Sequence, residues 1–229
     1  MNTVIVTGAS GNMGQALVKK FLAESYRVIG TVVPGHPDQT GIENANFEAV
    51  AVDLMNEDDA QDFIKKIISK YQDIQAVIAT VGGFAMGSID NTTTGDILKQ
   101  YKLNFETAYN IARPAFVHMM EKRSGRIFLV GSRPGLNAAE GKGMVAYGLA
   151  KSLLFHLAEL MNVEAKGVNV VTSVVVPGTI DTPPNRASMP AVDFDSWVKP
   201  EAIADIIYFY CTDAANIVRS PVIKVYNNA

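Results

Sequence analysis

The stretch "TGASGNMG", Thr7 to Gly14, places three glycines at three-residue intervals directly after an apolar run, residues 4–6. An apolar run that ends in such a loop and continues into a helical pattern predicts a strand, a tight turn and a helix in succession. Glycine permits a positive φ and lets the backbone come close to a ligand. The spacing matches neither the G-x-G-x-x-G pattern nor the lysine-bearing loop that cradles nucleoside triphosphates. Other parts of the chain must therefore indicate what this loop binds.

The composition is that of one globular domain without a strongly charged surface. The 229 residues contain no linker, repeat or low-complexity segment, which predicts a single domain over 1–229. The formal net charge of -3 gives no electrostatic footprint for nucleic acid or for an anionic membrane. The one cysteine, Cys211, excludes an internal disulfide, and no apolar run has the length of a membrane span. Because no leader pattern follows Met1, we expect a cytoplasmic protein.

Seven short runs rich in Val and Ile predict buried strands, at residues 3–7, 27–33, 47–53, 74–81, 126–131, 168–176 and 221–225. Most are continuously apolar, which is typical of strands in a parallel sheet covered on both faces. Helical patterns lie between them, at 12–24, 57–71, 96–122, 143–166 and 200–210, and we expect Pro114 to interrupt or bend the third. This alternation predicts a Rossmann-type α/β fold, a doubly wound parallel sheet of about seven strands with helices on both faces.

The glycine loop lies where a parallel strand turns into a helix, which is a usual place to bind a pyrophosphate. A helix that opens near Asn12 would offer free N–H groups and the positive end of its dipole. We therefore predict that a dinucleotide is held by Gly8, Ser10, Gly11, Asn12, Met13 and Gly14. The alternative is a tight turn without a ligand, because short glycine motifs also arise by chance.

Other strand ends carry small or polar residues along the same edge, where ligands of open parallel sheets bind. Asp53 would accept a hydrogen bond from an adenine amine, or would instead cap the helix opening near Asn56. Val33 stands where an acid would favour NAD, so the sequence leaves NADH and NADPH open. His36 is a candidate contact for a 2′-phosphate or an ordinary loop histidine, and no residue spacing suggests a metal site. The predicted cofactor contacts at these strand ends are Val33, Asp53, Leu54, Val81, Gly82, Gly83, Pro177, Gly178, Ile180 and Thr182.

Tyr147 and Lys151 are four residues apart in a predicted helix, so they share one face of it. Ser132 follows the fifth predicted strand, and Asn104 lies in the helix before that strand. Reduction of a carbonyl places negative charge on its oxygen, which needs a proton donor and a stabilising hydrogen bond. Tyr147 would donate the proton, with its pKa lowered by the Lys151 ammonium, which would also hold the cofactor ribose. Tyr147 is a predicted cofactor contact as well. Ser132 would orient the substrate oxygen, and Asn104 would hold a water leading to Lys151. The alternative for the pair is a half-buried tyrosine beside a solvated lysine.

Together these features resemble the short-chain dehydrogenase/reductases along nearly the whole chain. The shared features are the glycine loop, Asp53, Asn104, Ser132, Tyr147, Lys151 and the turn from Pro177-Gly178 to Thr182. The resemblance implies NAD(P)-dependent oxidoreduction by a homodimer or homotetramer paired through the helices that carry Asn104 and Tyr147. Three departures indicate an outlying branch: Asn12 replaces the usual middle glycine, residues 79–82 replace Asn-Asn-Ala-Gly, and Ser132 and Tyr147 are slightly further apart than usual.

Within the family, the chain resembles the dihydropteridine reductases. It shares their G-x-x-G-x-x-G rhythm, the turn "VGGF" ending at Phe84 and, most specifically, "DTPPNRASMPAVDFDSW" at residues 181–197. A loop this long without an evident helix or strand pattern predicts a substrate lid over 177–199. Its candidate contacts are Asn185, Arg186, Met189 and Trp197, with Trp197 alternatively a hydrophobic anchor.

Ser132 bears on the substrate, because dihydropteridine reductases generally lack a serine at this place. The resemblance therefore leaves two classes open, a quinonoid pterin and a small ketone, aldehyde or oxoacyl compound. The expected function is NAD(P)H-dependent hydride transfer to one of these, with Tyr147 as general acid/base. The alternative is a non-catalytic dinucleotide sensor that uses the same pocket.

Overall fold

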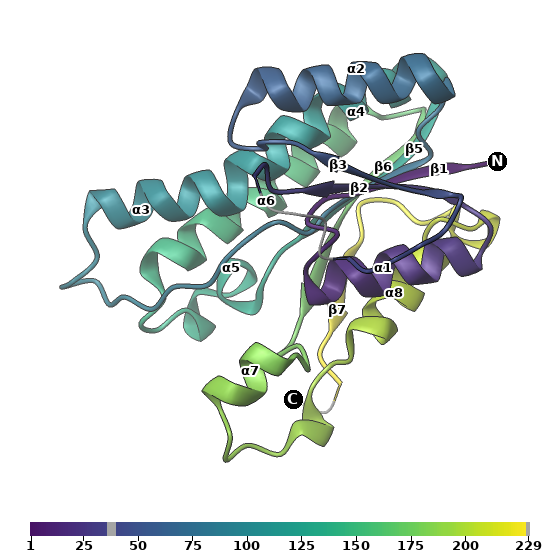
Figure 1. The fold of residues 1–229 in the computed structure, drawn as a ribbon. Coiled ribbons are helices and arrows are strands. Elements are labelled where there is room, and N and C mark those ends of the chain that lie inside the picture. The colour runs from purple at the N-terminus through teal and green to yellow at the C-terminus, as the bar shows by residue number, and fades with distance from the viewer. Residues whose placement is uncertain (36–39, 228–229) are drawn as a thin grey trace.

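The computed structural model describes residues 1–35 and 40–227, and its centre is one parallel sheet with the order β3-β2-β1-β4-β5-β6-β7 (Figure 1). The strands are β1 (Thr3–Val6), β2 (Arg27–Val32), β3 (Phe47–Ala51), β4 (Ala76–Ala79), β5 (Ser124–Val130), β6 (Asn169–Pro177) and β7 (Val222–Val225). The strand order reverses between β1 and β4, which creates the crevice where open sheets bind ligands. The predicted doubly wound α/β fold and its seven strands are confirmed.

Helices cover both faces of the sheet. The elements are α1 (Asn12–Ala23), α2 (Glu57–Tyr71), α3 (Thr94–Tyr101), α4 (Thr107–Lys122), α5 (Arg133–Leu136), α6 (Val145–Glu164), α7 (Pro183–Ser188) and α8 (Pro200–Phe209). Figure 1 shows α2 and α4 above the sheet, with α1 and α8 below it. Within the described residues, no helix combines the length and hydropathy needed to cross a bilayer.

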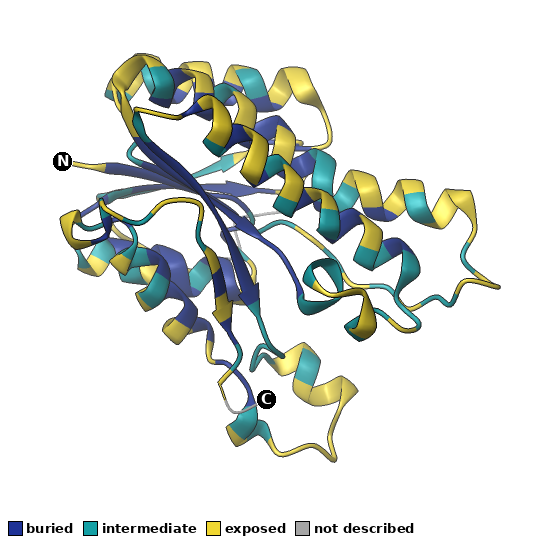
Figure 2. Cartoon of the chain, turned by 180° about the vertical axis from the view of Figure 1, so that it is seen from behind, coloured by how far each residue is buried: buried dark blue, intermediate teal, exposed yellow. Residues whose placement is uncertain are grey.

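The strands are apolar on both sides because the sheet separates two hydrophobic cores. In β1, Ile5 packs into the core under α2, α4 and α6, whereas Val4 and Val6 pack into the core under α1 and α8. This alternation follows from the two-residue period of a strand. Figure 2 shows the central strands almost entirely buried between exposed outer helix faces. Continuous Val/Ile runs in the sequence therefore reflect burial on both faces.

The helix predicted over 96–122 is divided, but not at the expected place. Its hydrogen bonds widen to a π-helix over Lys102–Glu106, between α3 and α4. Pro114 lies inside α4, which continues through it at the cost of one backbone hydrogen bond. The prediction that Pro114 causes the break was wrong. The π-helix instead surrounds Asn104, one of the candidate catalytic residues.

The glycine loop is tied to the neighbouring strand ends. Gly8 adopts a φ of +61°, the left-handed conformation expected of a glycine there. The side chain of Thr80, after β4, donates to Thr7 O at 2.5 Å, and Thr80 N donates to Thr7 Oγ1 at 3.0 Å. Gly14, in the first turn of α1, passes so close to the loop that a Cβ would lie 2.1 Å from Gly8 O. The loop therefore packs tightly on its own helix.

We predict that Gly14→Ala destabilises the protein, because its methyl group must displace the Gly8 backbone. Overpacking of this kind costs about 1–3 kcal/mol. Gly95→Ala is the matched control, since Gly95 also lies in the first turn of a helix but its nearest atom to an added Cβ is 3.5 Å away. Urea unfolding of the two variants measures the difference. Equal stability of Gly14→Ala and the wild type would contradict the tight packing of the loop.

Candidate active site

The N-terminus of α1 is shaped to receive a phosphate group. Gly11 is its N-cap and no side chain caps the helix, so the N–H groups of the first turn are left for another acceptor. The missing side chains of Gly8 and Gly14 leave the loop narrow enough to bring these groups to one edge of the sheet. Free N–H groups at a helix start, beside a switch point, fit the pyrophosphate of a dinucleotide. The predicted loop residues thus have the geometry that such a ligand requires.

An exposed apolar residue, Val33, follows the second strand, and an exposed acid, Asp53, follows the third. Asp53 lies two residues beyond β3, and its Oδ1 accepts from Met55 N at 2.9 Å. Asn56, not Asp53, caps α2 by accepting from the first-turn N–H groups, so the alternative role of Asp53 as a cap was wrong. Val33, after β2, is also exposed, whereas the side chain of Leu54 is buried in the core. His36 lies outside the described residues.

Lys151 and Asn104 meet beneath Gly82, the loop residue after β4. A Cβ on Gly82 would lie 2.7 Å from Asn104 Oδ1 and 3.1 Å from Lys151 Nζ. The sequence-predicted contacts of three different elements are therefore brought together. Lys151 is buried in α6, and its Nζ donates to Val130 O at 2.7 Å, at the end of β5.

Asn104 is fully buried and binds protein groups at both ends of its amide. Its Oδ1 accepts from Gly83 N at 3.0 Å, and its Nδ2 donates to Gly83 O at 3.0 Å and to Gln100 Oε1 at 2.9 Å. The side chain thus holds the loop after β4 against the π-helix. The predicted role of Asn104 in holding a water stays a prediction, with its side-chain amide bound to protein groups.

Ser132 and Tyr147 lie side by side, as predicted from their order in the chain. Ser132 caps the short helix α5, with its Oγ accepting from Gly135 N at 3.3 Å. A Cβ on Gly135 would lie 2.7 Å from Lys151 Cβ, so α5 rests directly on α6 at the lysine. Tyr147 is half-buried one turn before Lys151, and its hydroxyl lies close enough to the Ser132 side chain for that side chain to affect the tyrosine pKa.

The pKa values of Tyr147 and Lys151 differ from the expected pattern. Burial raises the pKa of Tyr147, and the hydrogen bond with Ser132 opposes this only in part. Burial lowers the pKa of Lys151 to about 8, because the charged form loses its hydration. The expectation that the ammonium lowers the tyrosine pKa was wrong here. The phenol consequently keeps its proton at neutral pH.

The segment predicted as a lid leaves the sheet after β6 and returns before α8. Its two ends pair with each other: Asp181 N donates to Val198 O at 2.8 Å, and Val198 N donates to Thr179 O at 2.9 Å. Between them lie α7 and a 3-10 turn, Phe194–Ser196. The expectation that this segment has no regular secondary structure was therefore wrong. Thr182 caps α7, which explains where that helix begins.

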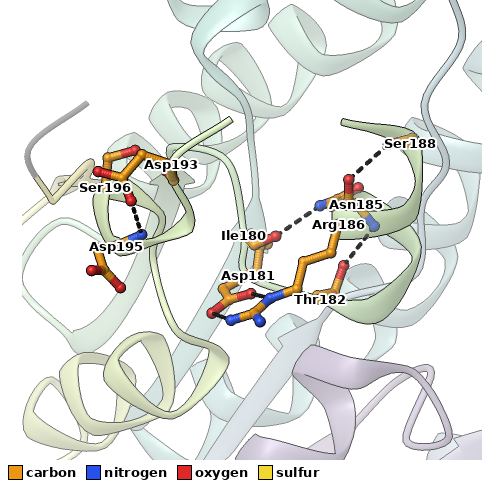
Figure 3. Close-up of polar contacts among 9 residues, drawn as sticks. All are labelled: Ile180, Asp181, Thr182, Asn185, Arg186, Ser188, Asp193, Asp195 and Ser196. Atoms are coloured by element: carbon orange, nitrogen blue, oxygen red, sulfur yellow. Dashed lines mark hydrogen bonds and ion pairs between the residues drawn. The ribbon is translucent and has the colours of Figure 1, made fainter. Parts of the chain in front are cut away.

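Polar contacts within this segment hold α7 against residues 180–181, which directly precede it (Figure 3). Arg186 forms a two-pronged ion pair with Asp181, at 2.5 and 2.7 Å, and its guanidinium lies 4.7 Å from the Phe194 ring centroid. Asn185 Nδ2 donates to Ile180 O at 2.8 Å. Trp197 is buried, with 5% of its surface exposed, which agrees with the role of hydrophobic anchor. Of the four candidate contacts, Met189 alone is neither buried nor engaged in such a polar contact.

Two groups near the catalytic residues were not predicted as site residues. Phe84 packs edge-to-face on Tyr147, with ring centroids 5.2 Å apart. Gln100 is buried and accepts from Asn104. The aromatic residue that ends "VGGF" was visible as part of a turn, but its contact with Tyr147 depends on how the loop folds. Gln100 belongs to no recognisable motif.

Comparison with known proteins agrees with this geometry. Residues 2–192 match the family model described as short chain dehydrogenase. The structure is similar to one described as ElxO with NADP bound, with a TM-score of 0.89, 21% sequence identity, and 98% of this chain and 96% of that chain covered. At this identity the likeness supports the fold alone.

Two curated relatives cover most of the chain. A dihydropteridine reductase of Dictyostelium discoideum is 28% identical, over 92% of this chain and 88% of its own. A cyclic-di-GMP-binding biofilm dispersal mediator protein of Escherichia coli (strain K12) is 31% identical, over 83% of this chain and 78% of its own. With the family match, the parallel sheet and the meeting of Asn104, Ser132, Tyr147 and Lys151, the chain belongs to the short-chain dehydrogenase/reductases, a family of NAD(P)-dependent oxidoreductases.

Proposed function

We propose that the protein is an NAD(P)H-dependent reductase of a small carbonyl compound or a quinonoid pterin, with Tyr147 as general acid/base. The observation that carries this proposal is the convergence of the Ser132 and Tyr147 side chains beside the buried Lys151. A pocket that only bound a dinucleotide would need no proton donor at this place. NADH and NADPH both remain candidates, because no acid follows β2 at Val33.

The arrangement of side chains supports proton delivery to a substrate oxygen. Bound NAD(P)H would supply the hydride. The carbonyl oxygen then gains negative charge, and Tyr147, protonated because burial raises its pKa, donates its proton to that oxygen. Ser132 donates a hydrogen bond to the same oxygen and orients it. The phenolate that remains regains a proton from solvent, and Lys151, one turn away, would hold the ribose of the bound cofactor.

The two substrate classes differ in their need for the Ser132 hydroxyl. A carbonyl oxygen that becomes an alkoxide is stabilised by a second hydrogen-bond donor, whereas a quinonoid pterin does not require this second hydrogen bond. Ser132 lies with its hydroxyl at Tyr147, which supports a carbonyl substrate. The dihydropteridine reductase among the relatives and the segment 181–197 support a pterin. We propose that segment 177–199 acts as the substrate lid in either case.

A non-catalytic dinucleotide sensor is the second candidate, and one comparison favours it. The relative at 31% identity is named for binding a nucleotide and for mediating biofilm dispersal rather than for a reaction. A sensor would bind NADH or NADPH without turning over any substrate.

We predict that Tyr147→Phe slows turnover and leaves cofactor binding intact, since only the proton donor is lost. General acid catalysis contributes roughly 100- to 10,000-fold, so the turnover rate should decrease by a factor in that range. The measurement is oxidation of NADH and of NADPH with quinonoid dihydropterin and with small ketones and aldehydes, beside cofactor titration by fluorescence. Ser132→Ala, assayed in parallel, should slow carbonyl reduction much more than pterin reduction. An unchanged turnover rate in Tyr147→Phe, or cofactor binding with no turnover by the wild type, would contradict the proposed reductase.

We further propose that the protein is a homodimer or a homotetramer that pairs through α4 and α6. One stripe of α6 exposes Leu149, Leu153 and Leu160 to solvent, and α4 exposes Tyr109 and Val117. These residues recur at helical spacing on faces turned away from the sheet. A second copy of the chain would bury both stripes.

Leu153→Glu is therefore expected to dissociate the assembly, because the substitution places a charge in the apolar stripe. Light scattering coupled to size exclusion measures the mass, and Gln61→Glu on α2 controls for an added negative charge elsewhere. Circular dichroism should show an unchanged fold, since Leu153 is 39% exposed. A wild-type monomer, or an unchanged mass in Leu153→Glu, would refute this mode of pairing.

A further inference from the structure

A groove with a volume of about 830 Å³ opens between α3, the start of α6 and the loop 84–88. The loop is fixed to α6, since Gly87 N donates to Gly143 O at 2.7 Å and Val145 N donates to Gly87 O at 2.9 Å. Phe84 lines the groove and also packs edge-to-face on Tyr147. One end of the groove therefore adjoins the catalytic tyrosine.

Gln100 lines this groove, and the orientation of its side-chain amide follows from its neighbours. It is buried, with 4% of its surface exposed. The N–H of Gly83 can only donate, so the Asn104 atom 3.0 Å from it must be Oδ1. Nδ2 of Asn104 can likewise only donate, so the Gln100 atom 2.9 Å from it must be Oε1. A backbone group thus fixes both amides in turn.

Nε2 of Gln100 is left as a free donor. It donates to no group of the described chain, and it is not among the fully enclosed polar atoms that lack a partner, Gln75 Oε1 and His118 Nε2. It therefore reaches open space, and Gln100 borders the groove. A donor held in a nearly buried position favours a ligand that brings an acceptor.

The protein itself uses some of the other polar groups that line the groove. Oδ2 of Asp96 already accepts from the N–H and hydroxyl of Thr93. Asn91 Oδ1 accepts from Ser88 N at 2.8 Å. Lys99, by contrast, forms no ion pair within the described part of the chain. Donors at Gln100 and Lys99 thus remain free beside apolar walls, together with Oδ1 of Asp96, the carboxylate oxygen that Thr93 does not use.

We propose that this groove binds the distal part of the substrate, with Gln100 Nε2 donating a hydrogen bond to a second acceptor group while the reducible carbonyl lies at Tyr147. The inference rests on the proposed reductase function and specifies its substrate class. That class is a carbonyl compound that carries an ester, thioester, amide or similar acceptor beyond an apolar spacer. The spacer packs against Phe84 and Leu103, which form apolar parts of the wall.

A series of methyl oxo-esters tests this, with the ester carbonyl moved one methylene at a time away from the ketone. The wild type should show an optimum in kcat/KM at one spacer length, roughly tenfold above a simple ketone of equal chain length. Gln100→Leu should remove this optimum. Gln100→Glu keeps an acceptor for Asn104 but replaces the free donor, so it should also lose the optimum while still reducing simple ketones. Gln61→Leu on α2 is the matched control and should keep the wild-type profile.

Two results would overturn the inference. One is an optimum that persists in Gln100→Leu and Gln100→Glu. The other is an equal loss of rate for every probe in both variants, since Gln100 would then only support Asn104. Lack of Tyr147-dependent turnover on all probes overturns the proposed function instead. In that case, calorimetry with the same esters tests whether the groove binds them. Weaker binding by Gln100→Leu than by the wild type supports the inference, and equal affinity overturns it.

Discussion

The hydrogen bond from Lys151 Nζ to Val130 O is the contact on which the rest of the site depends. Val130 ends β5, two residues before Ser132, and Lys151 lies one turn after Tyr147 in α6. A single contact of 2.7 Å therefore joins the two elements that carry the catalytic hydroxyls. A buried ammonium is costly unless its protons find acceptors, so this contact also determines where the lysine can lie.

Two glycines without side chains leave the space that Lys151 and Asn104 occupy. Gly82 and Gly135 both approach the lysine, and a side chain on either would collide with Lys151 or with Asn104. Asn104 in turn holds Gly83, so the loop after β4 is fixed relative to α6. The parallel sheet makes this convergence feasible, because the carboxyl ends of all its strands lie at one edge. Burial then sets the protonation states, with a protonated tyrosine beside a lysine of lowered pKa.

The features that follow from local pattern were predictable from the sequence. Apolar runs indicated the seven strands, and the glycine rhythm indicated a strand, a turn and a helix, with loop glycines that permit a positive φ, as Gly8 adopts. The meeting of Ser132 with Tyr147 followed from the order of the elements. The π-helix around Asn104 did not, since it depends on reaching Gly83 across the site rather than on any local residue preference.

Properties that depend on how deeply a side chain is buried could not be predicted from the sequence. The pKa of Tyr147 moves in the direction opposite to the expected one, because desolvation outweighs the hydrogen bond from Ser132. Helix α7 was missed because residues 181–197 show no evident helix pattern, although the two leading prolines of the helix are well tolerated in its first turn. Gln100 carries no pattern of its own and becomes significant only through its contact with Asn104.

The pKa of Lys151 in solution tests the central claim most directly. The chemical shift of its ε-methylene carbon can be followed by NMR against pH, with the signal assigned by its loss in Lys151→Arg. The structure predicts a midpoint of about 8. Exposed lysines should titrate near their ordinary value of about 10.4. A Lys151 that titrates together with those lysines would show that the ammonium is solvated, and would contradict a site assembled around its burial.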